Sequence, residues 1–266
     1  MQILVAVRSH WPEYLMEAAG LASFMLSACL FTALFEYPES PLRKAIPDPF
    51  FRRALVGIAM GLTAIAIIYS PWGQRSGAHL NPSVTLTFLS LGRIHGWDAL
   101  FYVVAQFAGG LLGVVVADWM LRGILRNSAV NYAVTVPGKG GVAAAFWAEF
   151  LISGLLMATV LLVSSSETLS RLTGLVAGAL IAVYVAFEAP LSGMSMNPAR
   201  TFGSALPAHL WNGWWVYVTA PLAGMLVAGR LYEMARGDAL THCAKLVRAP
   251  ARCRLFRCNF CKVAER

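Results

Sequence analysis

Six stretches of this chain are apolar over about 20 residues each, which is the length that a helix needs to cross the hydrocarbon core of a bilayer. They lie at about residues 14–34, 53–70, 98–120, 142–164, 171–189 and 213–234. Charged residues make up 13% of the chain, against about 25% in a typical soluble domain. Because backbone inside lipid must satisfy its own hydrogen bonds, segments of this kind fold as helices. We therefore predict an all-α, multi-pass membrane protein.

Two ten-residue segments, 116 positions apart, repeat one pattern. Residues 76–85 read SGAHLNPSVT and residues 192–201 read SGMSMNPART, with five of ten positions identical. Asn is a good helix N-cap, and Pro suits the first helical position because its missing N–H has no partner there. The apolar stretches that follow, about 81–91 and 197–207, are too short to span a bilayer. Each segment therefore predicts irregular backbone that leads into a half-helix.

The two halves of the chain correspond beyond this motif. Glu17 lies in the first apolar stretch and Glu149 in the fourth, where an acid is costly unless it is paired or faces the protein interior. Three spans per half is an odd number, so the second half must be inverted relative to the first. The half-helices then enter from opposite faces and meet near the middle of the membrane. We expect one channel domain, residues 1–236, with repeat halves at about 10–125 and 140–236, followed by a basic tail, residues 237–266.

These features resemble the aquaporin (major intrinsic protein) family over about residues 10–235. Besides the two boxes and the two carboxylates, Gln106 and Pro221 fit the family pattern. The resemblance implies six transmembrane helices plus two half-helices in an inverted repeat. It also implies a bacterial-type passive channel for water or small neutral solutes, a homotetramer and no cofactor. The boxes are Asn81, Pro82 and Ser83, and Asn197, Pro198 and Ala199; Ser83 replaces the usual Ala, whose volume is similar, so we expect the pore to be retained.

The boxes suggest how such a pore would exclude protons. Each half-helix carries roughly half a positive charge at its N-terminus, so two facing ends repel cations. The side-chain amides of Asn81 and Asn197 can donate to a passing water, which then cannot continue a proton wire. We expect pore-facing backbone carbonyls along the irregular stretches, at Gly77, Ala78, His79, Gly193 and Ser195, with Glu17, Glu149 and Gln106 as buried support.

Arg200 lies one helical turn after Asn197, where a fixed cation and its fork of donors would repel cations and bind a solute oxygen. The family resemblance places the rest of the selectivity filter at Met60 (or else Gly61), Val185 and Met194. Val widens such a filter, whereas two flexible Met side chains narrow it again. Glu188 is either a partner of Arg200 or a solvated acid at the mouth.

The residues leave the solute range open. Thr201 stands where glycerol channels of the family typically carry Asp, which favours water. Tyr217 and Val218 are closer to the nodulin-like group, which passes small neutral solutes. A facilitator of glycerol, urea, ammonia or metalloid hydroxides is therefore the alternative, and a structural membrane protein with a vestigial pore is another. We expect no enzyme and no metal site, because His79 and Asp118 form no triad, dyad or ligand set with Glu17 or Glu149 at a known spacing.

The formal net charge of +8 is concentrated in the tail and does not indicate a nucleic-acid partner. With both termini in the cytoplasm of a plasma or inner membrane, thirteen basic residues lie inside and eight outside, which agrees with the positive-inside rule. The tail also holds His242, Cys243, Cys253, Cys258 and Cys261. They could start a zinc site or accept lipid, but we expect a reduced basic tail beside anionic lipid.

Overall fold

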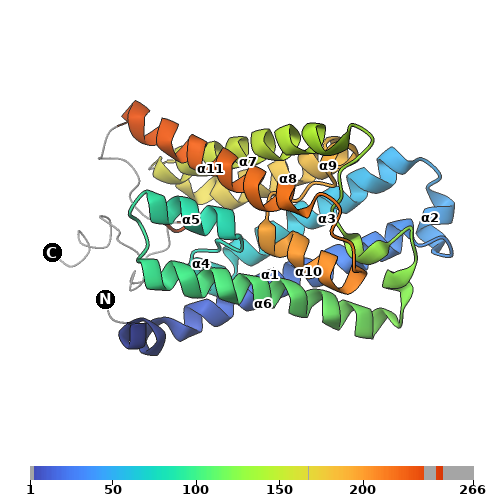
Figure 1. The fold of residues 1–266 in the computed structure, drawn as a ribbon, viewed down its shortest axis with the longest axis horizontal. Helices are drawn as coiled ribbons and strands as arrows, with labels where there is room; N and C mark the ends of the chain where they lie inside the picture. The colour runs from blue at the N-terminus through green and yellow to red at the C-terminus, as the bar shows by residue number, and fades with distance from the viewer. Residues whose placement is uncertain (1–2, 167, 237–243, 248–266) are drawn as a thin grey trace.

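The structure, a computed structural model, describes residues 3–166, 168–236 and 244–247 and is built from helices (Figure 1). The six long helices are α1 (Ile3–Glu36), α3 (Pro49–Tyr69), α6 (Gly96–Leu121), α7 (Gly141–Ser165), α8 (Thr173–Phe187) and α11 (Trp214–Arg236). The two half-helices are α5 (Pro82–Ser90) and α10 (Pro198–Ala208). Shorter elements connect them: α2 (Pro41–Ala45), α4 (Pro71–Ser76), η1 (Ile124–Arg126), η2 (Asn131–Ala133), η3 (Ser170–Leu172) and α9 (Ala189–Ser192). This is the predicted all-α architecture.

The packing follows the predicted repeat. Helix α1 packs along α6 in the first half, α7 packs along α11 in the second, and α3 meets α8 between the halves. Helix α1 begins and α11 ends at the same end of the molecule, where α5 also lies, while α10 lies further toward the opposite end (Figure 1). The half-helices therefore sit as an inverted repeat requires.

Within the described residues, five helices are long and apolar enough to cross a membrane: α1, α3, α6, α7 and α8 together with η3. The sixth predicted span became α11, which falls outside that set because Trp214, Trp215, Tyr217 and Arg230 lower its mean hydropathy. Its packing against α7 nevertheless matches that of α6 against α1. Aromatic side chains at the start of a span are typical of a membrane interface.

Helix α1 begins eleven residues before the predicted boundary at residue 14, despite Pro12 within it. Two side chains fasten this early part to α6. His10 Nδ1 lies 2.8 Å from Asp98 Oδ1, and the Tyr14 hydroxyl donates to the same oxygen at 2.6 Å. These buried contacts explain why the helix extends past the apolar stretch.

Glycines bring the paired helices into backbone contact. A Cβ atom at Gly109 or Gly113 of α6 would lie 2.1 Å or 2.3 Å from the carbonyl oxygens of Ala18 and Ala22 in α1. A Cβ atom at Gly224 of α11 would likewise lie 2.2 Å from the carbonyl oxygen of Phe150 in α7. Small residues at such positions are what membrane helices use to pack closely. The glycines of α6 thus serve packing within this chain.

Candidate functional site

Each half-helix begins directly after its Asn. The Asn81 Oδ1 atom accepts from the Ser83 amide at 2.8 Å, and the Asn197 Oδ1 atom accepts from the amides of Ala199 and Arg200 at 3.0 Å and 3.2 Å. Both Asn residues have extended backbone, and a proline follows as the first helical residue. This is the N-cap arrangement that the sequence predicts.

The two boxes are joined to each other by their side-chain amides. Asn81 Nδ2 donates to the carbonyl of Met196 at 2.7 Å, and Asn197 Nδ2 donates to the carbonyl of Leu80 at 2.7 Å. Each side chain therefore binds the carbonyl that precedes the opposite Asn. An Asn amide has two N–H donors, so one of them remains on each side chain for a solute.

Two buried carboxylates hold the irregular stretches in place. Glu17 accepts from the amides of His79 and Leu80 at 3.1 Å and 2.6 Å, and Glu149 accepts from those of Ser195 and Met196 at 2.7 Å each. Both side chains are fully buried. Each also accepts from the serine that opens its motif, Ser76 or Ser192, and Gln106 donates to Glu17 at 2.9 Å. Because the carboxylates accept from the N–H groups of each stretch, its backbone carbonyls remain available on the other side of the backbone.

The backbone of the two stretches has the same unusual conformation. Gly77 and Gly193 have φ of 93° and 83°, Ala78 and Met194 both have 53°, and Leu80 and Met196 have 52° and 54°. A positive φ is uncommon outside glycine, and such residues concentrate at functional sites, where the surroundings hold them. The carboxylate contacts above supply that support.

Two tyrosines complete this support, and the sequence analysis missed their role. The Tyr102 hydroxyl donates to the Ser76 carbonyl at 2.6 Å, and the Tyr217 hydroxyl donates to the Ser192 carbonyl at 2.6 Å. The only sequence signal is their nearly equal distance from the two serines, 26 and 25 residues. That spacing has meaning only once the repeat is aligned.

A cavity of about 610 Å³ passes both Asn residues. Ten of the predicted site residues line it: Asn81, Asn197, Met60, Val185, Met194, Arg200, Ala78, His79, Gly193 and Ser195. The others are buried beside it: Gly77, Pro82, Ser83, Pro198, Ala199, Glu17, Glu149 and Gln106. The sequence motifs therefore converge on one hollow in the structure.

The four predicted filter residues reach this cavity from separate segments. Met60 comes from α3, Val185 from α8, Met194 from the stretch before α10, and Arg200 from α10 itself. Gly61, the other assignment, lies at the crossing of α3 and α8, because a Cβ atom there would be 2.5 Å from the carbonyl of Gly178. The geometry favours Met60 as the lining residue.

Arg200 keeps a donor that no described residue uses. Its Nη1 atom is buried and has no hydrogen-bond partner within the described part of the chain. Glu188 is not a solvated acid, as one prediction had it, because it is buried. Both of its carboxylate oxygens lack a hydrogen-bond partner among the described residues, so the alternative pair with Arg200 is not formed there.

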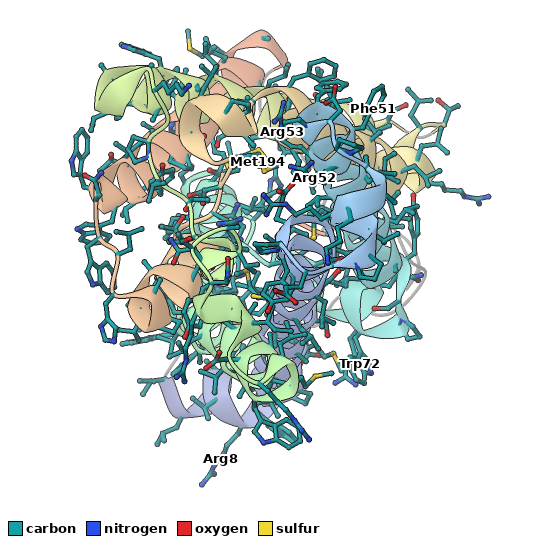
Figure 2. The ribbon with its side chains drawn as sticks, turned by 90° about the vertical axis from the view of Figure 1, so that its right-hand side faces the viewer. Arg8, Phe51, Arg52, Arg53, Trp72 and Met194 are labelled. Atoms are coloured by element: carbon teal, nitrogen blue, oxygen red, sulfur yellow. The ribbon has the colours of Figure 1, made fainter. Side chains whose placement is uncertain are left out.

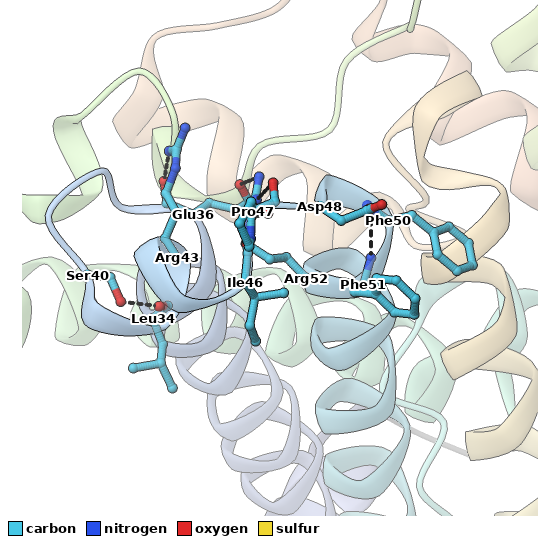
Figure 3. A network of polar contacts seen from close by, with 10 residues as sticks. All are labelled: Leu34, Glu36, Ser40, Arg43, Ile46, Pro47, Asp48, Phe50, Phe51 and Arg52. Atoms are coloured by element: carbon cyan, nitrogen blue, oxygen red, sulfur yellow. Dashed lines mark hydrogen bonds and ion pairs between the residues drawn. The ribbon is translucent and has the colours of Figure 1, made fainter.

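Arg52, labelled in Figure 2, braces the end of the molecule that carries α2. The Arg52 guanidinium binds both oxygens of Glu36, at 3.2 Å and 3.1 Å, and donates to the carbonyls of Ile46 and Pro47 at 3.0 Å and 2.7 Å (Figure 3). Glu36 and Arg53 line the cavity. The sequence analysis counted both arginines only as charge.

No group of three or more His, Cys, Asp or Glu side chains within residues 3–166, 168–236 and 244–247 could hold a metal ion. The tail residues of the zinc and lipid alternatives, His242, Cys243, Cys253, Cys258 and Cys261, lie outside the described residues. Cys29 is buried in α1.

Comparison with known proteins agrees with this geometry. The family model described as "Major intrinsic protein" matches residues 8–232. The chain is similar to aquaporin NIP1-2 of Oryza sativa subsp. japonica, with 38% identity over 66% of this chain and 58% of that protein. It is also similar to aquaporin NIP1-4 of the same species, with 36% identity over 68% and 64%. The chain thus spans less than two thirds of the length of these relatives.

Among solved structures, the chain resembles an aquaglyceroporin from Plasmodium falciparum. The TM-score is 0.71 at 23% sequence identity, and the match covers 85% of this chain and 96% of that one. At this identity the match supports the fold.

Proposed function

The chain belongs to the major intrinsic protein family, and we propose that it is a passive transmembrane channel for water and small uncharged solutes that excludes protons and ions. One observation carries the proposal. Both half-helix starts and all four candidate filter side chains line the same cavity. Irregular backbone at membrane depth is tolerated where it lines such a cavity.

Proton exclusion follows from the paired boxes. The positive ends of α5 and α10 both face the cavity at Asn81 and Asn197, so a cation there meets two like partial charges. The remaining N–H of each Asn side chain donates to the oxygen of a water between them. A water that accepts two hydrogen bonds cannot accept from its neighbours in the file, which interrupts proton transfer along the water chain.

The filter sets the solute range. Arg200 is the one charged residue among the four filter positions and offers an unused N–H to a solute oxygen. Val185 contributes no donor, and Met60 and Met194 contribute flexible apolar walls. We propose water as the main solute. A wider range of small neutral solutes is the second candidate, which the small apolar Val185 favours.

We further propose that both termini are cytoplasmic in a plasma or inner membrane and that the channel is a homotetramer without enzymatic activity. The positive-inside count of thirteen basic residues against eight supports this orientation. The start of α1 and the end of α11 lie at one end of the molecule, which suits termini on one side (Figure 1). The tetramer is proposed from the family.

Stopped-flow light scattering of proteoliposomes tests the proposal. Wild type is compared with Met60→Phe/Val185→His under osmotic gradients of an impermeant solute and of glycerol. Leu62→Phe is the matched control, because Leu62 lies two residues further along α3 and is exposed on the helix surface. We expect water-driven shrinkage faster than that of protein-free liposomes in wild type and control.

The glycerol arm separates the two candidates. Shrinkage without glycerol re-entry identifies a water channel whose methionines narrow the filter. Glycerol entry that is lost in the double variant but kept in Leu62→Phe identifies the wider filter. Absence of water and glycerol flux from correctly inserted protein, including a variant with its pore mouth opened as described below, would contradict the channel proposal.

A further inference from the structure

A short piece of the C-terminal tail lies against the pore at the end where α1 begins. Residues 244–247 are separated from α11 by residues that the structure does not describe, yet all four of them are buried. Leu246 lines the same cavity as His79 and Asn81. It also belongs to the apolar cluster that includes Ala78 and Val84. This piece therefore occupies the mouth of the cavity.

The tail binds the polar groups that the pore would otherwise offer to water. The Leu246 amide donates to the carbonyl of Gly77 at 3.2 Å. The Ala244 carbonyl lies 2.8 Å from Nε2 of His79, and since a carbonyl can only accept, that nitrogen donates. Gly77 and His79 are both in the irregular stretch that the sequence predicts to line the pore. Two of its polar groups are thus taken by backbone of the tail.

We infer that residues 244–247 act as a plug that closes the channel at the end where both its first helix begins and its last helix ends. The inference rests on the proposed water conduction. The second half of the repeat offers a comparison: Gly193, Met194 and Ser195 line the cavity from the opposite box, and among the described residues no tail segment is bonded to them. The plug therefore breaks the symmetry of the repeat at one mouth.

The contact is small enough to be reversible. Among the described residues it consists of two hydrogen bonds and the burial of residues 244–247, of which Leu246 has the largest apolar side chain. Loss of one ordinary hydrogen bond shifts a two-state ratio by about fivefold. Open and closed populations can therefore exchange without unfolding of the helices.

A flux measurement on the full chain tests closure. Leu246→Pro removes both the amide that donates to Gly77 and the side chain that lines the cavity. We expect water permeability per inserted channel to rise by about fivefold or more over wild type. Val263→Pro, a change of the same kind elsewhere in the tail, should leave permeability unchanged. Equal permeability of wild type and Leu246→Pro, with both conducting, would overturn the plug.

A cross-linking measurement tests the position of the tail independently of flux. Ala78→Cys/Leu246→Cys is made in a chain whose tail cysteines, Cys243, Cys253, Cys258 and Cys261, are changed to Ser. Ala78 follows Gly77, the acceptor of the Leu246 amide, and Ala78 and Leu246 line the same cavity, so we expect the two thiols to come within cross-linking reach. Oxidation or a short bifunctional thiol reagent should join them faster than the pair Ala78→Cys/Val263→Cys.

The two readouts separate the two ideas. Disulfide cross-linking that lowers water permeability, with the permeability restored by reductant, supports both the channel and its plug. Cross-linking no faster than in the control pair overturns the plug whatever the flux. Fast cross-linking with no flux in any variant, Leu246→Pro included, places the tail at the mouth but overturns closure of a working channel together with the proposed function.

Discussion

Ser83 differs from the alanine of the family box by one added oxygen atom, which makes no hydrogen bond with a described residue. Its side chain is fully buried, and its hydroxyl has no hydrogen-bond partner in the described part of the chain. A buried polar group without a partner retains its full cost of desolvation. We predict that Ser83→Ala stabilises the protein by about 1 kcal/mol. A thermal unfolding midpoint above that of wild type in detergent would show it.

Ser76→Ala provides the control, because Ser76 is equally buried in the same half but uses its hydroxyl. The Ser76 hydroxyl donates to Glu17 at 2.7 Å and accepts from the Ala78 amide at 3.2 Å. We expect this change to cost about 1–2 kcal/mol. If the two variants shifted the midpoint in the same direction, hydrogen bonding at position 83 would have been misjudged.

Individual residues could be predicted from the sequence where the repeat supplied a second copy. Asn81 with Asn197 and Glu17 with Glu149 were found in this way, and their contacts in the structure match in pairs. Glu188 has no counterpart, and its predicted solvation was wrong because its side chain is buried where α8 ends and α9 begins. Burial of a single side chain at a helix end depends on packing that periodicity does not encode.

At the scale of elements, we predict that the close packing of α6 against α1 depends on the glycines of α6. Gly109→Ala would place a methyl group 2.1 Å from the Ala18 carbonyl, and backbone cannot move aside as a flexible side chain can. Overpacking of this kind typically costs about 1–3 kcal/mol. We expect α1 and α6 to separate locally and the unfolding midpoint to fall by the corresponding amount, as measured by circular dichroism or by size exclusion after heating.

Gly96→Ala is the matched change in the same helix. Nothing lies within 4 Å of a Cβ atom at Gly96, so the methyl group meets open space. The substitution also removes the conformational freedom of glycine in the unfolded chain, so a small stabilisation is expected. A fall of the midpoint equal to that of Gly109→Ala would show that α6 is sensitive to helix composition and not to its contact with α1.

The elements themselves were largely predictable, because long apolar stretches in lipid have few alternatives to helix. The half-helices begin within one residue of the predicted boundaries, since Asn-Pro fixes the start of each. The early start of α1 was not predictable. It depends on His10 and Tyr14 meeting Asp98, which lies more than eighty residues away in the chain.

At the scale of the whole molecule, the sequence predicted the inverted repeat but not what lies at its mouth. Residues 237–266 carry charge and cysteines and indicate a tail at a membrane surface. The contact of Leu246 with the Gly77 carbonyl is a backbone hydrogen bond, so no pattern of side chains in the sequence predicts it. Predicting that a short segment docks at the pore mouth requires the three-dimensional shape of that mouth, which the sequence alone does not supply.

The half-helix character of α5 also fixes which surface loops share a side of the membrane. Its nine residues rise about 14 Å, less than half of a hydrocarbon core of about 30 Å. The chain therefore crosses three times between Arg8 and Lys139, through α1, α3 and α6, and once more through α7 before Arg171. We predict that Arg8 and Arg171 face one side and Glu39 and Lys139 the other.

Single-cysteine variants at these four exposed positions, in a chain whose five natural cysteines are replaced, test this arrangement. A membrane-impermeant thiol reagent applied to intact cells should label Glu39→Cys and Lys139→Cys, and should label Arg8→Cys and Arg171→Cys only after the membrane is opened. If α5 crossed the membrane fully, Lys139→Cys would share the protection of Arg8→Cys. The two half-helix starts would then no longer point toward each other, and the cavity between the two Asn residues would lose its paired donors.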